Sequence, residues 1–363
     1  MSPTVDPTPF YKKLAFNLLS LSLMGAILYV GQSILIPLFF SMLLATLLLP
    51  LVMFMEKRKI NRVVAILLSL LLSIITLLGV IYFLSSQMAN FFQDFDIIKE
   101  RLTEVFNSAQ QWVGEQFNIA IRKQEELIED TKEKVEAGKI VGQTFISITS
   151  FLSYIVLIPV YTFLLLYYKD LIKQFFIHIF RNDNEEQIRE VLHESRLVSQ
   201  SFITGLLIDV VIVFALNSTG FLILGIKYAL FLALTAALLN LVPYIGMIAA
   251  NIFCMLITLV SSENISDVLW VGLVLALVQL VDNNFLMPFI VGSKVRINAM
   301  ATLIGVLVGG ALCGIPGMFL AIPGIAVLKV IFDRVDGLRP YGILVGDNVD
   351  TPTLSFRRLR MKK

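Results

Sequence analysis

Apolar runs long enough to cross a bilayer constrain this chain more than any other feature of its sequence. A helix needs about 20 apolar residues to cross a hydrocarbon core roughly 30 Å thick. Runs of about this length cover residues 14–30, 33–55, 63–86, 144–168, 201–224 and 266–287. The composition agrees, because 57% of the 363 residues are hydrophobic and only 15% are charged, against about 25% charged in soluble domains. We therefore expect an all-α polytopic membrane protein with six spanning helices.

Two further apolar runs, 228–260 and 299–332, are longer and contain helix breakers. As one straight helix, the first run would be about 50 Å long, which exceeds the bilayer core. Pro243 divides it, and the stretch GGALCGIPGMFLAIPG at 309–324 divides the second run. Backbone that leaves helical geometry at membrane depth must be buried in protein or line a wet cavity. We expect each run to form a broken or re-entrant helical hairpin, and a pair of proline-kinked spanning helices is the alternative.

The same spacing recurs around the two breaks. Asp209 and Pro243 are 34 residues apart, and so are Asp282 and Pro316. A single offset of 73 residues therefore aligns Asp209 with Asp282 and Pro243 with Pro316. The charges of the loops favour opposite membrane orientations for the two copies. Inverted repeats with interrupted helices near the bilayer midplane form the substrate sites of many secondary transporters. We predict a transport core of this kind over residues 201–335.

Basic residues in the short loops indicate the orientation of the chain. Lys12 and Lys13 precede the first run, EKRKINR (56–62) follows the second, and FRRLRMKK ends the chain. Only YVGQS separates the first two runs, so we expect them to form a tight helical hairpin that returns the chain to its starting side. These observations predict a multi-pass membrane protein with cytoplasmic N- and C-termini.

Changes in polarity divide the chain into five predicted units. These are an N-terminal three-span bundle (1–86), an extracytoplasmic amphipathic helical segment (87–143), a fourth span with a cytoplasmic connector (144–200), the transport core (201–335) and a cytoplasmic tail (336–363). In the outer segment, apolar residues recur at helical spacing over 88–113, and a charged stretch follows at 122–139. We expect two helices there, serving either as a packing or assembly element or as a lid.

Two aspartates lie within the apolar runs, where a carboxylate is costly and usually faces protein or water. Asp209 lies in ITGLLIDVVIVF and Asp282 in VQLVDNNFLMP. Gln279, Asp282 and Asn283 are spaced i, i+3 and i+4, so they share one helix face. That face either lines a path or packs against another helix as a polar clamp. Tyr244, at the first break, either offers its hydroxyl to the path or anchors at the membrane interface. The predicted substrate or ion pathway consists of Asp209, Asn240, Pro243, Tyr244, Gly246, Gln279, Asp282, Asn283, Asn284, Pro288, Gly314, Pro316 and Gly317.

Several function classes are disfavoured by motifs that the sequence lacks. It has no glycine-rich phosphate loop with a following lysine, no zinc spacing and no serine elbow, so we expect neither an enzyme nor a built-in ATP motor. A net charge of +2 gives no indication of nucleic-acid binding. Cys254 and Cys313 lie in apolar runs, so we expect buried thiols there. His178 and His193 lie far apart in a polar stretch. We expect no resident cofactor or metal, and Na⁺ or H⁺ is the candidate coupling ion.

Over residues 200–332 the sequence resembles the autoinducer-2 exporter family of bacterial membrane proteins. LLNLVPYIGMIAA resembles the Pro-Tyr-Ile-Gly segment of that family. The stretch from Gln279 to Gly324 resembles its signature of glutamine, acid, asparagine, proline and glycine, followed by a glycine-rich closing run. The positions that match are Gln279, Asp282, Asn284, Pro288, Gly292, Gly309, Gly310, Gly314, Gly317 and Pro323. The N-terminal half matches in layout alone.

Several residues depart from the family pattern. Asp282 stands where the family usually has glutamate, and Asn283 stands where it has glycine. Asn298 and Ala299 replace a common His-Pro pair, and Met247 replaces a common proline. The shorter acid and the missing histidine leave the substrate open.

The resemblance implies a function without naming its cargo. Some similar proteins are described as exporters of autoinducer-2 and others as sodium/proton antiporters. We therefore expect a secondary transporter of a bacterial inner membrane that exports a small polar solute by alternating access. Sodium/proton antiport is the alternative function, and a homo-oligomer is the expected assembly. An oligomeric scaffold or channel-like protein, whose outer helices organise partners, is a third interpretation.

Overall fold

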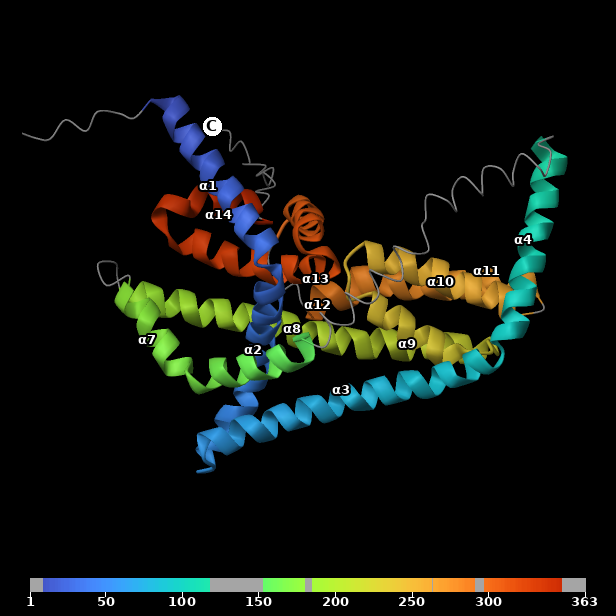
Figure 1. Cartoon of the computed structure of the whole chain (residues 1–363), viewed down its shortest axis with the longest axis horizontal. Coiled ribbons are helices and arrows are strands. Elements are labelled where there is room, and N and C mark those ends of the chain that lie inside the picture. The colour runs from blue at the N-terminus through green and yellow to red at the C-terminus, as the bar shows by residue number, and fades with distance from the viewer. Residues whose placement is uncertain (1–8, 118–152, 180–184, 263, 291–296, 348–363) are drawn as a thin grey trace, which may run out of the picture.

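The computed structural model describes residues 9–117, 153–179, 185–262, 264–290 and 297–347, and it is almost entirely helical over these ranges (Figure 1). The first half contains α1 (Phe10–Val30), α2 (Gln32–Lys57), α3 (Arg62–Gln93), α4 (Phe95–Phe117), an unlabelled helix (Ser153–Tyr167) and α7 (Lys169–Ile179). The second half contains α8 (Glu185–Ile223), α9 (Ala229–Leu239), α10 (Ile245–Ser261), α11 (Ile265–Val281), the π-helix η1 (Asp282–Leu286), α12 (Met287–Ile290), α13 (Ala299–Arg334), the short 3₁₀ helix η2 (Asp336–Leu338) and α14 (Arg339–Val345). Among the described residues, the one β-type contact is an isolated bridge between Ile297 and Gly346. The predicted all-α class is confirmed.

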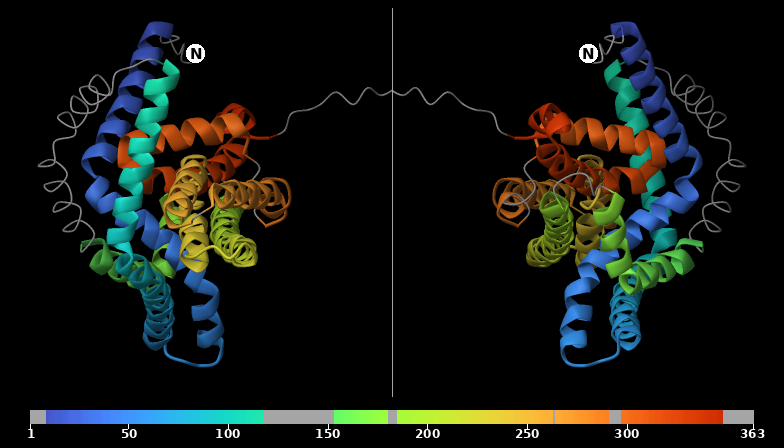
Figure 2. Two further views of the ribbon diagram at one scale, coloured as in Figure 1. Left: turned by 90° about the vertical axis from the view of Figure 1, so that its right-hand side faces the viewer. Right: turned by 90° about the vertical axis from the view of Figure 1, so that its left-hand side faces the viewer.

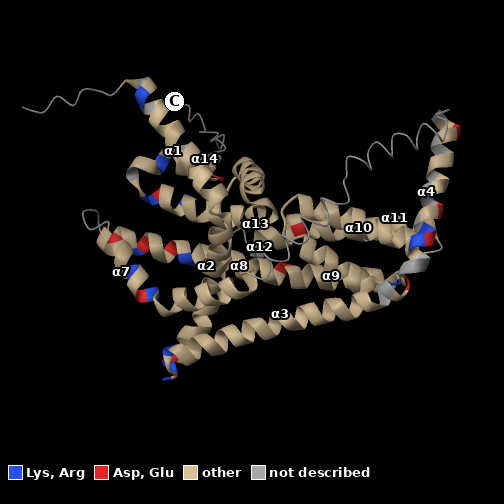
Figure 3. Cartoon of the chain, viewed as in Figure 1, with Lys and Arg blue, Asp and Glu red and all other residues tan. Residues whose placement is uncertain are grey.

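Five helices are long and apolar enough to cross a membrane, and a sixth is obtained if one bent pair counts as a single span. The five cover Gln32–Lys57, Arg62–Ala89, Glu185–Ile223, Ile265–Phe289 and Ala299–Arg334, and the bent pair is Ser153–Tyr167 with Lys169–Ile179. Figure 3 shows almost no charged residues along the bodies of α3 and α9, whereas the first part of α8 and α4 carry many. This distribution suits helices whose middles lie in hydrocarbon.

The expected tight hairpin between the first two apolar runs is wrong. Only Gly31 separates α1 from α2, and its dihedral angles (φ −83°, ψ 2°) do not reverse the chain. Gly31 donates to the Ile27 carbonyl, and Leu35 donates to the Gly31 carbonyl, so helical hydrogen bonds continue across the junction. The chain runs on in one general direction through a bend (Figure 1). Residues 14–55 therefore do not form the two antiparallel crossings that were expected.

The first broken run folds as a helical hairpin, as predicted. α9 and α10 have 11 and 17 residues, so they extend about 16 and 25 Å, and each is shorter than the bilayer core. They run antiparallel, since the Cys254 thiol of α10 donates to the Leu232 carbonyl of α9 at 3.6 Å. The tip includes Pro243 and Tyr244, and Tyr244 has φ +61° and ψ −55°. Ile245 donates its N–H to the Pro243 carbonyl at 2.7 Å, which makes the tip a strained γ-turn.

The second broken run also folds back on itself. Within α13, Cys313 and Gly314 leave helical geometry, and Gly314 has φ +62° and ψ −150°. A Cβ on Gly309 would overlap the Gly317 carbonyl, and one on Gly305 would overlap Ile325. Residues 305 and 325 would be about 30 Å apart in a straight helix, so the two arms of α13 must lie against each other. The predicted break near Gly314 is confirmed.

The hydrophobic core has two main parts, which α3 connects. One packs α9, α10, α11 and the end of α8, with Phe221, Leu232 and Cys254 fully buried. The other packs α2, the start of α3 and the Ser153–Tyr167 helix around Val52 and Ile66. The end-on views in Figure 2 show α8 to α11 grouped as a bundle with α2 and α3 along its edge. This grouping agrees with a separate core in the C-terminal half.

The connector and the fifth apolar run form one helix. α8 extends 39 residues from Glu185, so the predicted boundary at residue 200 falls inside it. Arg334, at the end of α13, pairs with Glu190 at 2.9 Å and with Glu194 at 3.0 Å. These contacts attach the polar start of α8 to the base of the second hairpin.

The outer segment is helical where it is described. The predicted amphipathic stretch 88–113 is divided between the end of α3 and α4, which turns sharply away from α3 (Figure 1). The second helix expected at 122–139 lies outside the described residues. At the corner, Asp94 accepts a hydrogen bond from the Tyr228 hydroxyl at 2.6 Å and pairs with Lys227 at 2.8 Å. The hydrogen bonds from Lys227 and Tyr228 hold the pKa of Asp94 below its usual value of 3.8. The corner is thereby attached to the base of the first hairpin.

We expect Asp94→Asn to lower the thermal unfolding temperature of the purified protein by a small amount at pH 7. Since the pKa of Asp94 is lowered, its contact stabilises the fold above the ordinary value of 3.8 and is lost as the pH falls through the lowered pKa. The difference between the two proteins should therefore shrink as the pH falls below 4, as measured by melting curves over a pH series. Asp267→Asn, on α11, is the control, and a difference that persists in acid would contradict the assignment.

Candidate transport site

The structure brings together the two aspartates that the sequence placed 73 residues apart. Asp209 lies on α8 and Asp282 begins η1, and each is only 2% exposed. Their carboxyl groups lie close enough to interact electrostatically. The Oδ1 atom of each is buried and has no hydrogen-bond partner among the described residues. The site therefore has two acidic side chains in contact, each with spare acceptor capacity.

Asp282 stands where the helical geometry changes. The regular α11 ends at Val281, and the π-helix begins with Asp282. A π-helical turn inserted in an α-helix occurs often at functional sites. The predicted span 266–287 is thus irregular at its acidic residue, which the apolar periodicity did not reveal.

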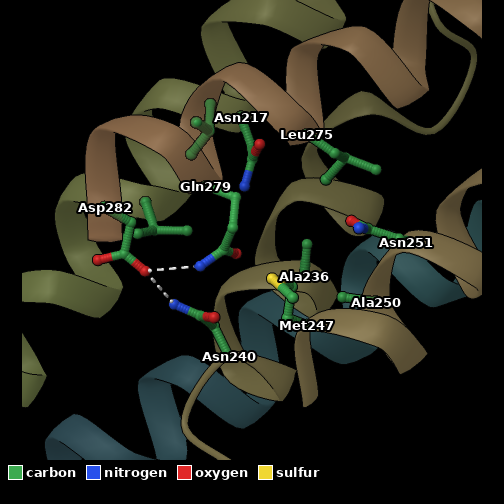
Figure 4. Close-up of a pocket in the computed structure, with 11 residues that line it drawn as sticks. Asn217, Ala236, Asn240, Met247, Ala250, Asn251, Leu275, Gln279 and Asp282 are labelled. Carbon is green, nitrogen blue, oxygen red and sulfur yellow. Dashed lines mark hydrogen bonds between the residues drawn. The ribbon is translucent and has the colours of Figure 1, made fainter. Parts of the chain in front are cut away.

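Asp282 also joins the end of α11 to the tip of the first hairpin. Its Oδ2 accepts hydrogen bonds from Asn240 Nδ2 at 2.9 Å and from Gln279 Nε2 at 3.3 Å (Figure 4). Gln279 Nε2 also donates to Asn283 Oδ1 at 3.1 Å, so the predicted shared face of Gln279, Asp282 and Asn283 is confirmed. Because Asn240 is the first residue after α9, a movement of the tip would change the contacts of Asp282.

A small cavity lies beside this network. Its volume is about 20 Å³, which is enough for about one water molecule. Its polar lining consists of Asn217, Asn240, Asn251, Gln279 and Asp282, and its apolar lining of Val213, Ala236, Met247, Ala250, Leu275 and Val278 (Figure 4). No basic side chain lines it, and within the described ranges neither aspartate forms an ion pair.

Two of the polar lining residues were not identified from the sequence. Asn217, on α8, is 2% exposed, and Asn251 lies in the second turn of α10. An amide inside an otherwise apolar run was the available signal, since such residues are costly in hydrocarbon. The helix on which each amide would find its partners could not be read from the chain.

Other predicted pathway residues lie outside the cavity. Tyr244 is 47% exposed and does not line it, while Gly246 is buried beneath the tip of the first hairpin. Asn284 is exposed and donates to the Leu280 carbonyl of its own helix at 2.8 Å. Pro288 and Asn283 are also exposed.

The second break does not reach the cavity either. Gly314, Pro316 and Gly317 lie at the tip of the second hairpin and are absent from the lining. Leu241, at the tip of the first hairpin, and Phe319, in the second, both pack against the apolar cluster around Phe202 on α8. Of the two hairpins, only the first contributes polar groups to the described cavity.

Sequence comparisons agree with this architecture. The family model described as AI-2E family transporter matches residues 18–337. The Bacillus subtilis protein YrrI is 34% identical over 130 residues, which cover 36% of this chain and 36% of that protein. The Mycobacterium tuberculosis protein MT0215 is 25% identical over 335 residues, which cover 89% of this chain and 90% of that protein. Escherichia coli YhhT is 30% identical over 127 residues, which cover 35% of this chain and 36% of that protein.

The names of these three relatives give transport as their inferred role. The match to YrrI spans about a third of its length, so its name alone says little about the whole chain. The match to MT0215 extends over nearly the whole of both proteins. The comparisons therefore support membrane transport without identifying a cargo.

Proposed function

Since this chain belongs to the AI-2E family of transporters, we propose that it is a secondary transporter that exports a small polar solute by alternating access, with the Asp209–Asp282 pair as its coupling centre. Family membership supports a transport role in place of an enzymatic one. Autoinducer-2-like solutes are the proposed cargo class, because the resemblance implies them and because amides can hydrogen-bond the hydroxyl groups of such solutes.

The single observation that carries this proposal is the contact between two buried carboxyl groups. Two negative charges in contact away from water repel each other strongly. Neither aspartate has a basic partner among the described residues, so the pair requires a proton or a cation. Release of that ion to one side and capture from the other is a means of coupling transport to an ion gradient.

Alternating access would begin at the first hairpin. The cavity admits about one water molecule, so an organic solute requires a state in which the tip has moved. Tyr244 holds a strained conformation at that tip, and strain of this kind is often found in elements that switch. Movement there would break the hydrogen bond from Asn240 to Asp282 and open the carboxyl pair to solute.

Sodium/proton antiport is the second candidate. The small volume of the cavity favours an ion over an organic molecule, and the carboxyl pair could exchange a proton for a cation. In either case we place both termini in the cytoplasm of a bacterial cell and propose a homo-oligomer, as the loop charges and the family resemblance suggest.

Flux in proteoliposomes tests the proposal. With autoinducer-2 inside the vesicles, an imposed proton gradient should accelerate efflux at least about tenfold over protein-free vesicles, and a protonophore should abolish the gain. Sodium-dependent proton movement without solute efflux would instead favour antiport. If neither flux exceeds that of protein-free vesicles, the proposal fails.

A further inference from the structure

Asn217 is a buried amide whose oxygen has no partner in the described part of the chain. It lies on α8, about two turns after Asp209, and only 2% of its surface is exposed. Its Oδ1 atom is fully buried without a hydrogen bond. Leaving such an oxygen unpaired is unfavourable, so a species in the cavity would be expected to satisfy it.

The cavity offers this species polar side chains from four directions. Asn217 comes from α8, Asn240 from the end of α9, Asn251 from α10, and Gln279 with Asp282 from α11 and η1 (Figure 4). The amide nitrogens of Asn240 and Gln279 are already used in bonds to Asp282, which leaves their oxygens free to act as acceptors. Hard cations prefer such carboxylate and amide oxygens.

The sign of the charge in the cavity is set by the aspartates. α9 ends and α10 begins beside it, and their dipoles of about half a charge have opposite signs there, so these contributions nearly cancel. Asp282 lies in the lining and contacts Asp209, and one shared proton would still leave one negative charge. A cation is therefore favoured over an anion.

The volume of the cavity and its net charge narrow the choice of cation further. A volume of about 20 Å³ accommodates one species of about the size of a water molecule. One net negative charge from the carboxyl pair, together with neutral amides, balances a monovalent ion, whereas divalent ions usually bind several carboxylates. Potassium is larger than sodium and suits the space less well.

We infer that Asn217, Asn251, Gln279 and Asp282 form a binding site for one dehydrated monovalent cation of the size of sodium, adjacent to the Asp209–Asp282 pair. The inference rests on the proposed function for its use, because a cation in this position would compete with the shared proton and couple the two ions. The site itself is tested without any transport measurement.

Thermal unfolding of the purified full-length protein in detergent provides that test. At constant ionic strength, sodium chloride should raise the melting temperature by roughly 2–5 °C over choline chloride, since a ligand that binds only the folded state stabilises it, and potassium chloride should raise it less. Asn217→Leu and Asn251→Leu should each remove the sodium shift. Thr219→Val is the control on α8, because Thr219 is exposed and bonds only to its own helix.

Two outcomes would overturn the inference. One is an equal melting temperature in sodium, potassium and choline, which would mean that water alone fills the cavity. The other is a sodium-dependent rise in melting temperature that persists in both Asn→Leu variants. If Asn217→Leu does not fold, Asn251→Leu still provides this comparison. Proton-driven solute efflux without any sodium shift would refute the cation site alone, whereas a sodium shift without any flux would refute the proposed function alone.

Discussion

Replacing Asp282 with asparagine should reduce gradient-driven flux in proteoliposomes by about 100-fold or more. Asparagine keeps the shape of the side chain but cannot carry a proton or a negative charge, and loss of a positioned proton-transferring group costs about 100- to 10,000-fold in enzymes. Asp282 is buried, contacts Asp209, and accepts the bonds from Asn240 and Gln279. Removal of its charge would therefore disable the coupling centre.

Two companion variants make this prediction specific. Asp209→Asn should lower flux by a similar factor, and the double variant should be hardly worse than either single one, because the two residues would act as a unit. Asp267→Asn, in the first turn of α11, should transport at the parental rate. Parental flux in Asp282→Asn, with protein of normal stability, would exclude this aspartate from the transport step.

Gly246→Ala should strongly destabilise the protein and remove transport with it. A Cβ at this position would overlap the carbonyl oxygen of Leu239 and crowd Val242, because α10 leaves the tip of the first hairpin directly against the end of α9. Neither backbone can move without disturbing Asn240. Forced overpacking of this kind costs about 1–3 kcal/mol and sometimes more, so we expect a fall of several degrees in the melting temperature.

Gly324→Ala is the matched control for this substitution. Gly324 lies within α13 and a Cβ there would meet nothing within 4 Å, so the change should be neutral or stabilising by about 0.5–1 kcal/mol. Melting curves of both variants in one detergent give the comparison. Equal melting temperatures for the two variants would mean that the first hairpin does not pack as described.

Local sequence signals predicted the hairpins correctly because breakers act locally. Proline cannot donate an N–H and glycine admits positive φ, so the positions of Pro243 and Gly314 indicated where the apolar runs divide. The same reasoning failed at Gly31, which the sequence analysis placed at a tight reversal. A glycine permits a turn without requiring one, and here its dihedral angles let the helical hydrogen bonds continue.

The candidate site was predictable only in part. Asp209 and Asp282 stood out because a carboxylate is costly in an apolar helix, and that cost depends on the residue and its immediate neighbours alone. Asn217 and Asn251 line the cavity but were not predicted as pathway residues. Tyr244 and the second break were predicted as part of the pathway but do not line the cavity. Each of these differences concerns which helix faces which, a property of packing between distant segments.

The sequence by itself therefore determined that this is a helical membrane protein with two broken runs and two acidic residues at membrane depth. The partition of apolar runs into hydrocarbon and the hydrogen bonding within a helix depend on neighbouring residues, so their consequences can be predicted along the chain. Only the tertiary structure decided that the two aspartates touch, that the tip of the first hairpin bonds to Asp282, and that two further amides complete the cavity. These contacts join α8, α9, α10 and α11 across tens of residues, and helix packing brings such segments together without leaving a local pattern.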